Sequence, residues 1–141
     1  MPQRFDDWPT RLDRFIESRK LESFAWGQHD CCLFACDAVL AMTGTDLAAD
    51  FRGQYHDARS ALEFLGGREL GDFAAENLAN QGVTELAAPQ RWARRGDMVL
   101  AEYQGQEALG VVGLAGDEAW VPGEFVLQKV PMEMVLRAWR I

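Results

Sequence analysis

A helix that is apolar on nearly every side constrains this chain most. Residues 31–43 form one predicted helix, with Asp30 placed to cap its first turn and Gly44 to end it. Its apolar side chains surround the helix instead of forming one stripe: Leu33, Phe34, Ala35, Ala38, Val39, Leu40 and Ala41. Such a helix is stable only when other elements cover it. We therefore expect the rest of the chain to pack around residues 31–43.

The chain changes character near Gly82. Before it, helical spacing predicts three further helices. The first begins near Asp7, with Pro9 in its first turn, the second spans 57–65 with Leu62 facing inward, and the third spans 72–81. A short helical turn is also expected at 47–51. After it, short apolar runs between turn residues predict strands at 98–103, 108–114, 118–121, 125–130 and 134–140. Helices first and strands second predict an α+β fold. The strands are expected to form a small antiparallel barrel or curled sheet.

The bulk properties fit one small domain. The 141 residues, 48% of them hydrophobic, suit a single domain over 1–141, with a mainly helical half (1–82) and a mainly strand half (83–141). No apolar run approaches the roughly 18 residues of a membrane span, and the polar, acidic N-terminus is unlike a secretion signal, so we expect synthesis in the cytoplasm. A net charge of −8 argues against nucleic acid or anionic membranes as partners.

The three cysteines, Cys31, Cys32 and Cys36, all fall on the predicted central helix. An odd number, at neighbouring helix positions that point apart, argues against a disulfide framework. Cys31 stands at the helix N-terminus, where partial positive charge favours the thiolate and lowers the pKa. It is therefore a candidate nucleophile, with a small core residue as the other interpretation. For Cys32 and Cys36 the core interpretation is preferred.

Two segments resemble NlpC-type cysteine peptidases, papain-like enzymes that cut peptide bonds in bacterial cell walls. Trp26-Gly27 followed by Asp30-Cys31 is similar to the motif that carries their nucleophile, although Cys32-Leu33 stands where the family has Ser-Gly. Residues 95–100 resemble the Gly-Asp strand start of the family, and residues 108–112 resemble the strand with its catalytic histidine. The resemblance implies a papain-like, NlpC-type fold whose central Cys-bearing helix packs on the C-terminal sheet.

The catalytic histidine of that family has no counterpart here. Aligning Gly110 with the family's glycine places Ala108 at the histidine position, and no histidine follows His56. A thiol nucleophile needs a base to take its proton. Two candidate bases exist: His29, two residues before Cys31, and His56, in the turn at 52–57. For both histidines, a loop or surface position is the preferred interpretation.

Other polar groups have simpler interpretations. Asp30 is expected to be a helix cap and Asp37 a solvent-facing or paired helix residue. His29, Cys32 and Cys36 have spacings that could present three zinc ligands, but no second Cys/His cluster would complete the site, so we expect neither metal nor cofactor.

Two further groups of residues have no place in these motifs. A basic cluster before the strands is expected to pair locally and not to bind phosphate: Arg91, Arg94 and Arg95. Three aromatic residues are either core residues or anchors for a partner: Trp92, Trp120 and Trp139.

A second resemblance covers nearly the whole chain. Short motifs in order are similar to a family of small proteins from tailed-phage and prophage tail gene clusters, itself a remote NlpC-type relative: residues 26–27, 30–31, 51–55, 108–111 and 138–140. It implies a component of the tail tip or baseplate in the virion, with other phage tail proteins (hub, distal tail or fibre-base proteins) as partners.

Three functions follow as hypotheses. The first is a structural or assembly component of a phage tail tip, built on a degenerate NlpC-type fold. The second is an active cysteine peptidase or amidase that cleaves peptidoglycan during phage entry. The third is an unrelated binding domain in which Cys31 is only a core residue.

Overall fold

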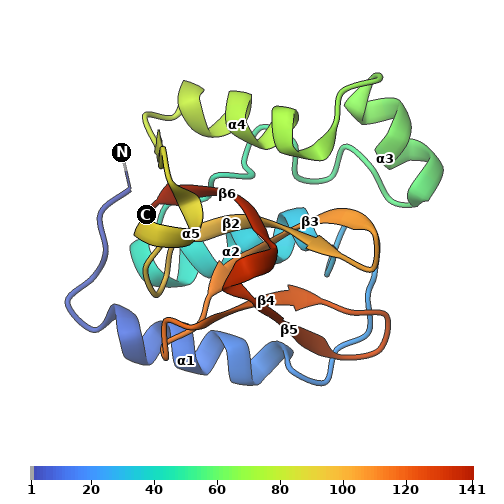
Figure 1. The fold of residues 1–141 in the computed structure, drawn as a ribbon. Helices are drawn as coiled ribbons and strands as arrows, with labels where there is room; N and C mark the ends of the chain where they lie inside the picture. The colour runs from blue at the N-terminus through green and yellow to red at the C-terminus, as the bar shows by residue number, and fades with distance from the viewer. Residues whose placement is uncertain (1) are drawn as a thin grey trace.

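The computed structural model describes residues 2–141 as four helices followed by a strand-rich half (Figure 1). The helices of the first half are α1 Trp8–Arg19, α2 Cys31–Thr43, α3 Ala58–Leu65 and α4 Leu70–Asn80. The second half contains β1 Thr84–Glu85, α5 Pro89–Trp92, β2 Met98–Tyr103, β3 Gln106–Val112, β4 Glu118–Pro122, β5 Leu127–Pro131, the 3-10 turn η1 Met132–Met134 and β6 Val135–Arg140. The predicted α+β order is therefore confirmed.

The six strands form one open antiparallel sheet in the order β1-β6-β2-β3-β4-β5, so no closed barrel forms. One face packs on the helices. The buried residues of the other face are all alanine or valine: Val99, Ala101, Ala108, Val112, Ala119, Val121, Val130, Val135 and Ala138. These small side chains allow the strands to curve over this face. A register shift between Leu100 and Ala101, where β2 pairs with β6, adds local twist.

The central helix is covered as its sequence requires. On one side Phe34 and Met42 of α2 pack against Leu12 and Ile16 of α1. On the other side α2 packs against α4 and the strands β2 and β3, within a cluster that includes Phe73. In Figure 1 the α3–α4 pair and α1 lie on opposite sides of α2 and the sheet. Leu40 is an exception, with 39% of its surface exposed.

Most helix ends lie where the capping and helix-ending residues in the sequence predicted them. Asp30 accepts a hydrogen bond from the backbone N–H of Leu33, and Gly44 ends α2 with a φ of 77°. Asp57 is the N-cap of α3, and Pro9 lies in the first turn of α1. The expected short helical turn at 47–51 is present as turns over 47–53, in which the backbone N–H groups of Phe51 and Arg52 both donate to the carbonyl of Ala48. Helix α4 begins two residues earlier than predicted.

Three features of the second half differ from the prediction. The predicted strands at 108–114 and 125–130 are observed at 106–112 and 127–131. The β2–β3 loop has two residues, since Tyr103 pairs with Gln106 and both Gln104 and Gly105 have positive φ, as in the tightest hairpin turns. The short elements β1 and α5 were not predicted.

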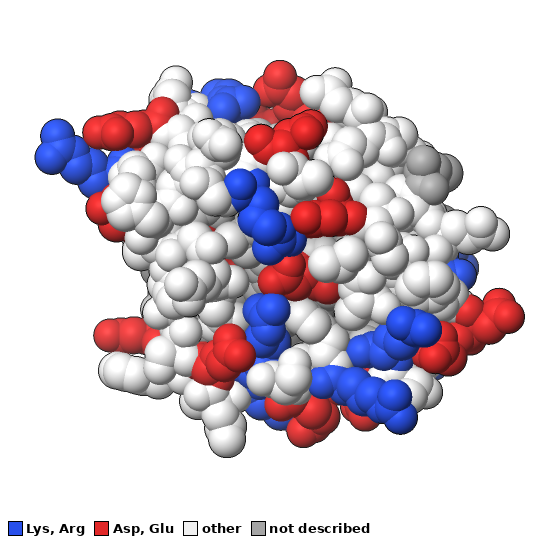
Figure 2. All heavy atoms as spheres, turned by 180° about the vertical axis from the view of Figure 1, so that it is seen from behind, with Lys and Arg blue, Asp and Glu red and all other residues white. Residues whose placement is uncertain are grey.

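Ion pairs cross the outer surface of α2. Asp37 accepts hydrogen bonds from Arg19 at 2.9 Å and from Arg52 at 2.7 Å, and Arg52 also contacts Asp46. The interpretation of Asp37 as a paired residue is confirmed. Acidic and basic side chains are interspersed on the face seen in Figure 2. No helix in the part of the chain described here has the length and apolar character that a membrane span needs.

The arginines and tryptophans noted in the sequence lie at separate positions. The guanidinium of Arg95 lies over the ring of Trp8, and that of Arg91 over Trp92. Trp139 belongs to the core, whereas Trp92 is 54% exposed. Trp120 is partly buried, and packs against the cluster of α1 and α2.

The fully buried Asp97 joins both ends of the chain to the start of β2. Its carboxylate accepts hydrogen bonds from the backbone N–H groups of Arg94 and Ile141, and from the side chains of Arg140 at 3.0 Å and Arg4 at 3.3 Å. Burial lowers the pKa of Arg4, with Asp97 opposing that shift. The Gly-Asp pair noted in the sequence therefore has a structural role, since the carboxylate organises four separate donors.

We predict that Asp97→Ala lowers the free energy of unfolding by about 3 kcal/mol or more, because it leaves two guanidinium groups and two backbone N–H groups without their shared acceptor. Urea unfolding followed by tryptophan fluorescence measures the change. The matched control is Asp117→Ala in the exposed β3–β4 turn, expected to change stability by less than about 0.5 kcal/mol. Equal stability of the two variants would contradict the role of Asp97.

Candidate functional site

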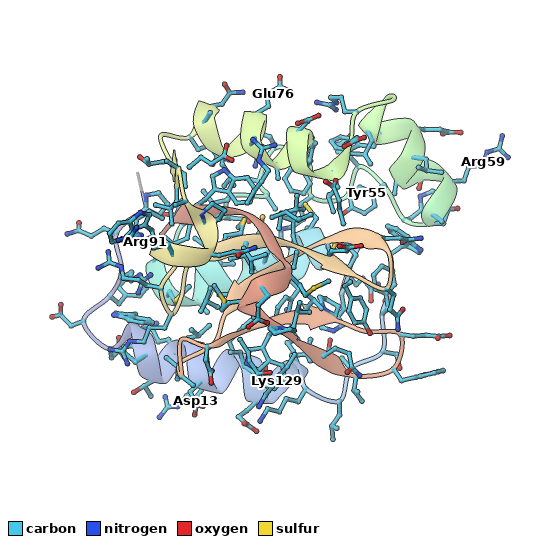
Figure 3. The ribbon with its side chains drawn as sticks, viewed as in Figure 1. Asp13, Tyr55, Arg59, Glu76, Arg91 and Lys129 are labelled. Carbon is cyan, nitrogen blue, oxygen red and sulfur yellow. The ribbon has the colours of Figure 1, made fainter. Side chains whose placement is uncertain are left out.

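A cleft of about 640 Å³ opens at the N-terminus of α2, between the α3–α4 pair and the β2–β3 hairpin. Six aromatic residues line it: Phe24, Trp26, Tyr55, Phe64, Phe73 and Tyr103. Figure 3 places Tyr55 in the region between α3 and this hairpin. Cys31, Cys32 and Ala108 also line the cleft. Of the residues predicted to carry chemistry, Cys31 is the one that reaches it.

The Asp30 carboxylate builds the wall beside Cys31. Its side chain is buried, and its two oxygens accept hydrogen bonds from the backbone N–H groups of Leu33 and Gly27, each at 2.9 Å. One group therefore caps α2 and fixes the loop that precedes it. Gly27 has a φ of +77°, and a Cβ there would lie 2.7 Å from the Tyr55 carbonyl oxygen. The spacing of Trp-Gly and Asp-Cys thus places Trp26 and Cys31 on the same cleft.

Cys31 is the first residue of α2, but its surroundings raise the pKa of its thiol instead of lowering it. It packs against the core cluster of α2 and α4 and against the alanine–valine cluster that includes Ala108. Burial raises the pKa of Cys31 to about 11; the charge of Asp30 adds to the rise, and a hydrogen bond with the backbone of Leu109 opposes it. The sequence predicted a lowered pKa from the helix N-terminus. Desolvation outweighs that effect because the thiolate would lie among apolar side chains.

The other two cysteines are core residues. Cys32 and Cys36 are 8% and 3% exposed and belong to the cluster that joins α2 to α4. Contact with Cys36 and then burial raise the pKa of the Cys32 thiol. Neither is disulfide-bonded, and within residues 2–141 no three His, Cys, Asp or Glu side chains are grouped to hold a metal ion.

His29 is turned toward α1 and is absent from the cleft lining. Its Nδ1 lies 3.2 Å from the guanidinium of Arg19 and 3.5 Å from Glu22, and its ring meets Phe34 edge-on. The Nε2 atom is buried without a hydrogen-bond partner in the described chain. Burial lowers the pKa of His29, and Arg19 lowers it further, while Glu22, Asp30 and Asp37 oppose the shift.

His56, the other candidate base, lies on the surface. Its side chain is 84% exposed and lies 3.5 Å from Asp57, the cap of α3. It is likewise absent from the cleft lining. The structure therefore brings neither predicted histidine to the cleft that holds Cys31.

Within the strand segment 108–111, the residue that lines the cleft is Ala108. It belongs to the cluster against which Cys31 packs. Two residues later, a Cβ at Gly110 would overlap the carbonyl oxygen of Trp120 on β4. The glycine is therefore needed for the close approach of β3 and β4, independently of any catalytic role.

Two polar residues of the cleft were missed as site residues. The side chain of Glu107, on β3, accepts a hydrogen bond from the backbone N–H of Gly71 in the first turn of α4 at 3.2 Å. Burial raises the pKa of Tyr55, and the charges of Cys32 and Asp30 add to this shift. Tyr55 belongs to the 51–55 motif, but Glu107 carried no sequence signal because its partner is 36 residues away.

We predict that iodoacetamide alkylates Cys31 roughly tenfold or more slowly than free N-acetylcysteine at pH 8, because a smaller thiolate fraction outweighs the greater nucleophilicity of a high-pKa thiol. The rate should keep rising with pH up to about 11. Mass spectrometry measures the labelling, and Cys31→Ser identifies the part due to Cys31. Rapid labelling at pH 6, with a plateau below pH 8, would contradict the raised pKa.

A second prediction concerns pH and His29. Because its folded-state pKa lies below the unfolded value, the unfolded chain binds the proton more readily, and stability is lost as pH falls through about 6.5 and below. Between pH 7 and pH 5 the free energy of unfolding should therefore fall more in the wild type than in His29→Gln. His56→Gln is the matched control and should follow the wild type. Parallel curves for all three proteins would contradict the assignment.

Comparison with known proteins identifies a family for this chain. No curated protein and no solved structure matches the chain. A family model described as a domain of unknown function, DUF6950, matches residues 3–141, which is nearly the whole chain. The protein therefore belongs to the DUF6950 family.

Proposed function

We propose that this protein is a non-catalytic, partner-binding component of a phage tail tip or baseplate, built on a degenerate papain-like, NlpC-type fold. Three structural features support the fold relation. A buried helix begins with the cysteine, the antiparallel sheet follows it in sequence, and the strand 106–112 reaches the same cleft as Cys31. The motifs behind the resemblance thus surround one cleft.

The observation that carries the proposal is the methyl group of Ala108. It lines the cleft with Cys31 at the position where the resemblance places the catalytic imidazole. No histidine, lysine or arginine is among the cleft-lining residues of the described chain. Thiol catalysis requires a base near the sulfur, and a raised thiol pKa makes that requirement stricter. The aromatic and apolar lining can bind a ligand, but no imidazole of the described residues lies in it to act as the base for Cys31.

The role in a virion tail rests on the resemblance to tail-cluster proteins, and two structural features favour a binding function. The cleft is largely apolar and aromatic, which is typical of binding sites. Around it Trp26 and Leu62 remain 42% and 70% exposed, as in surfaces that a partner covers. The partners would be other tail proteins, such as the hub, distal tail or fibre-base proteins, and the location would be the virion.

The alternative is an active cysteine peptidase or amidase that cleaves peptidoglycan during phage entry. One observation favours it: Cys31 is the first residue of a helix and lines an open cleft of a size that admits a ligand. In that case a base would have to come from a bound partner or substrate.

Two measurements test the proposed function. Purified protein and Cys31→Ser should both fail to release soluble fragments from peptidoglycan sacculi, and Cys31-dependent release would establish the enzyme. Antibodies against the chain should label the tail end of particles from a phage that encodes it, as seen by immuno-electron microscopy. Particles that lack the protein would contradict a virion role.

A further inference from the structure

Taking the proposed binding function as its basis, we infer that the cleft docks a polypeptide segment of the partner in which an apolar side chain lies next to a lysine or arginine. The inference rests on three properties of the cleft: its apolar floor, the sign of its charges, and an apolar rim that continues beyond it.

The floor of the cleft suits an apolar side chain. Phe64 and Phe73 contact each other edge-to-face with ring centroids 5.4 Å apart, and Tyr55 lies 5.9 Å from Phe64. The ring centroids of Trp26 and Tyr55 are 6.5 Å apart, so the aromatic surface runs from the loop that precedes α2 to helix α4. These rings are fixed by their mutual packing. The cleft would therefore lose little conformational entropy when it buries an aliphatic or aromatic side chain.

The charges in the lining are all negative. Its carboxylic acids are Asp30, Glu107 and Glu124, and no lysine, arginine or histidine of the described residues 2–141 lines the cleft with them. Asp30 is buried and already accepts two backbone hydrogen bonds, and Glu107 holds the start of α4 through one oxygen. Glu124 is exposed, and its side chain forms no ion pair with the rest of the described chain. Arg59 of α3 projects away from the cleft in Figure 3 and pairs with Glu63.

A cation of the partner fits this arrangement better than an anion or a neutral group. Carboxylates at the rim attract a lysine or arginine, and the aromatic faces stabilise it through cation–π contacts. The net charge of −8 adds a long-range attraction for basic segments.

The rim favours a polypeptide over a small molecule. Leu62, which lines the cleft, is 70% exposed, and Phe125, which follows the lining residue Glu124 in the sequence, is 69% exposed. A ligand confined to the cleft would leave Phe125 in water, whereas a segment that continues past Glu124 can cover it. Gln104 and Gln106 of the hairpin also line the cleft and offer carboxamides to the main chain of such a segment.

Selection from a library of random dodecapeptides displayed on filamentous phage tests the inference. The immobilised wild-type chain should enrich peptides with an apolar residue within two positions of Lys or Arg. The most enriched peptide, made synthetically, is then titrated by fluorescence anisotropy. No enrichment, or enrichment of acidic or uncharged peptides, would overturn the inference.

Matched variants assign the binding to the cleft. Glu124→Lys and Leu62→Ser should each lower the affinity for the selected peptide roughly tenfold or more, equivalent to about 1.4 kcal/mol. The controls, Glu133→Lys and Leu21→Ser, change exposed residues outside the cleft lining and should leave the affinity within about twofold. All four proteins should keep the wild-type unfolding midpoint within a few degrees. Equal affinity of the two Glu→Lys variants would overturn the charge argument.

Failure of this selection is separable from failure of the proposed function. Tail localisation and inactivity on sacculi test whether the chain is a non-catalytic virion protein. The peptide selection tests only what occupies its cleft.

Discussion

The carboxylate of Asp30 holds the site together. It is a buried charge with two backbone donors, and such a group stabilises a structure only while its partners stay in place. Because one donor belongs to α2 and the other to the preceding loop, helix and loop cannot shift independently. The loop in turn packs at Gly27 against the backbone of Tyr55. One interaction thus positions Trp26, Cys31 and Tyr55, which come from three parts of the chain, around the same cleft.

The chemistry of Cys31 shows two opposing effects at one atom. A helix N-terminus favours a thiolate through a modest electrostatic attraction that weakens within one turn. Removal of the thiolate from water disfavours it more strongly, and here the sulfur lies between two apolar clusters. Active cysteine enzymes reverse this balance with an imidazolium partner. The methyl group of Ala108 supplies no such partner, and burial raises the pKa of the thiol.

The predictability of each feature depends on the range of the interaction that determines it. The ends of α2 were predicted to the residue because Asp30 and Gly44 act on backbone groups within the same few residues. The start of β3 was not, because Gln104 adopts a positive φ that its residue type does not announce. The two-residue strand β1 is defined only by its pairing with β6, more than fifty residues away. Sequence neighbours also separated in space: His29 and Cys31 are two residues apart but face different sides of the fold.

The motifs that suggested an enzyme have structural roles of their own in this chain. A side chain at position 27 would clash with the carbonyl oxygen of Tyr55, and one at position 110 would clash with the backbone of β4. Asp30 accepts a hydrogen bond from the first turn of α2. Asp97 is required by the donors that converge from both ends of the chain. None of these needs depends on a working thiol. A catalytic base, by contrast, contributes little to folding, and the cleft of this chain forms with alanine at position 108. The same architecture can therefore carry a sequence pattern that resembles that of a hydrolase around the acidic, aromatic cleft that we propose to be a binding site.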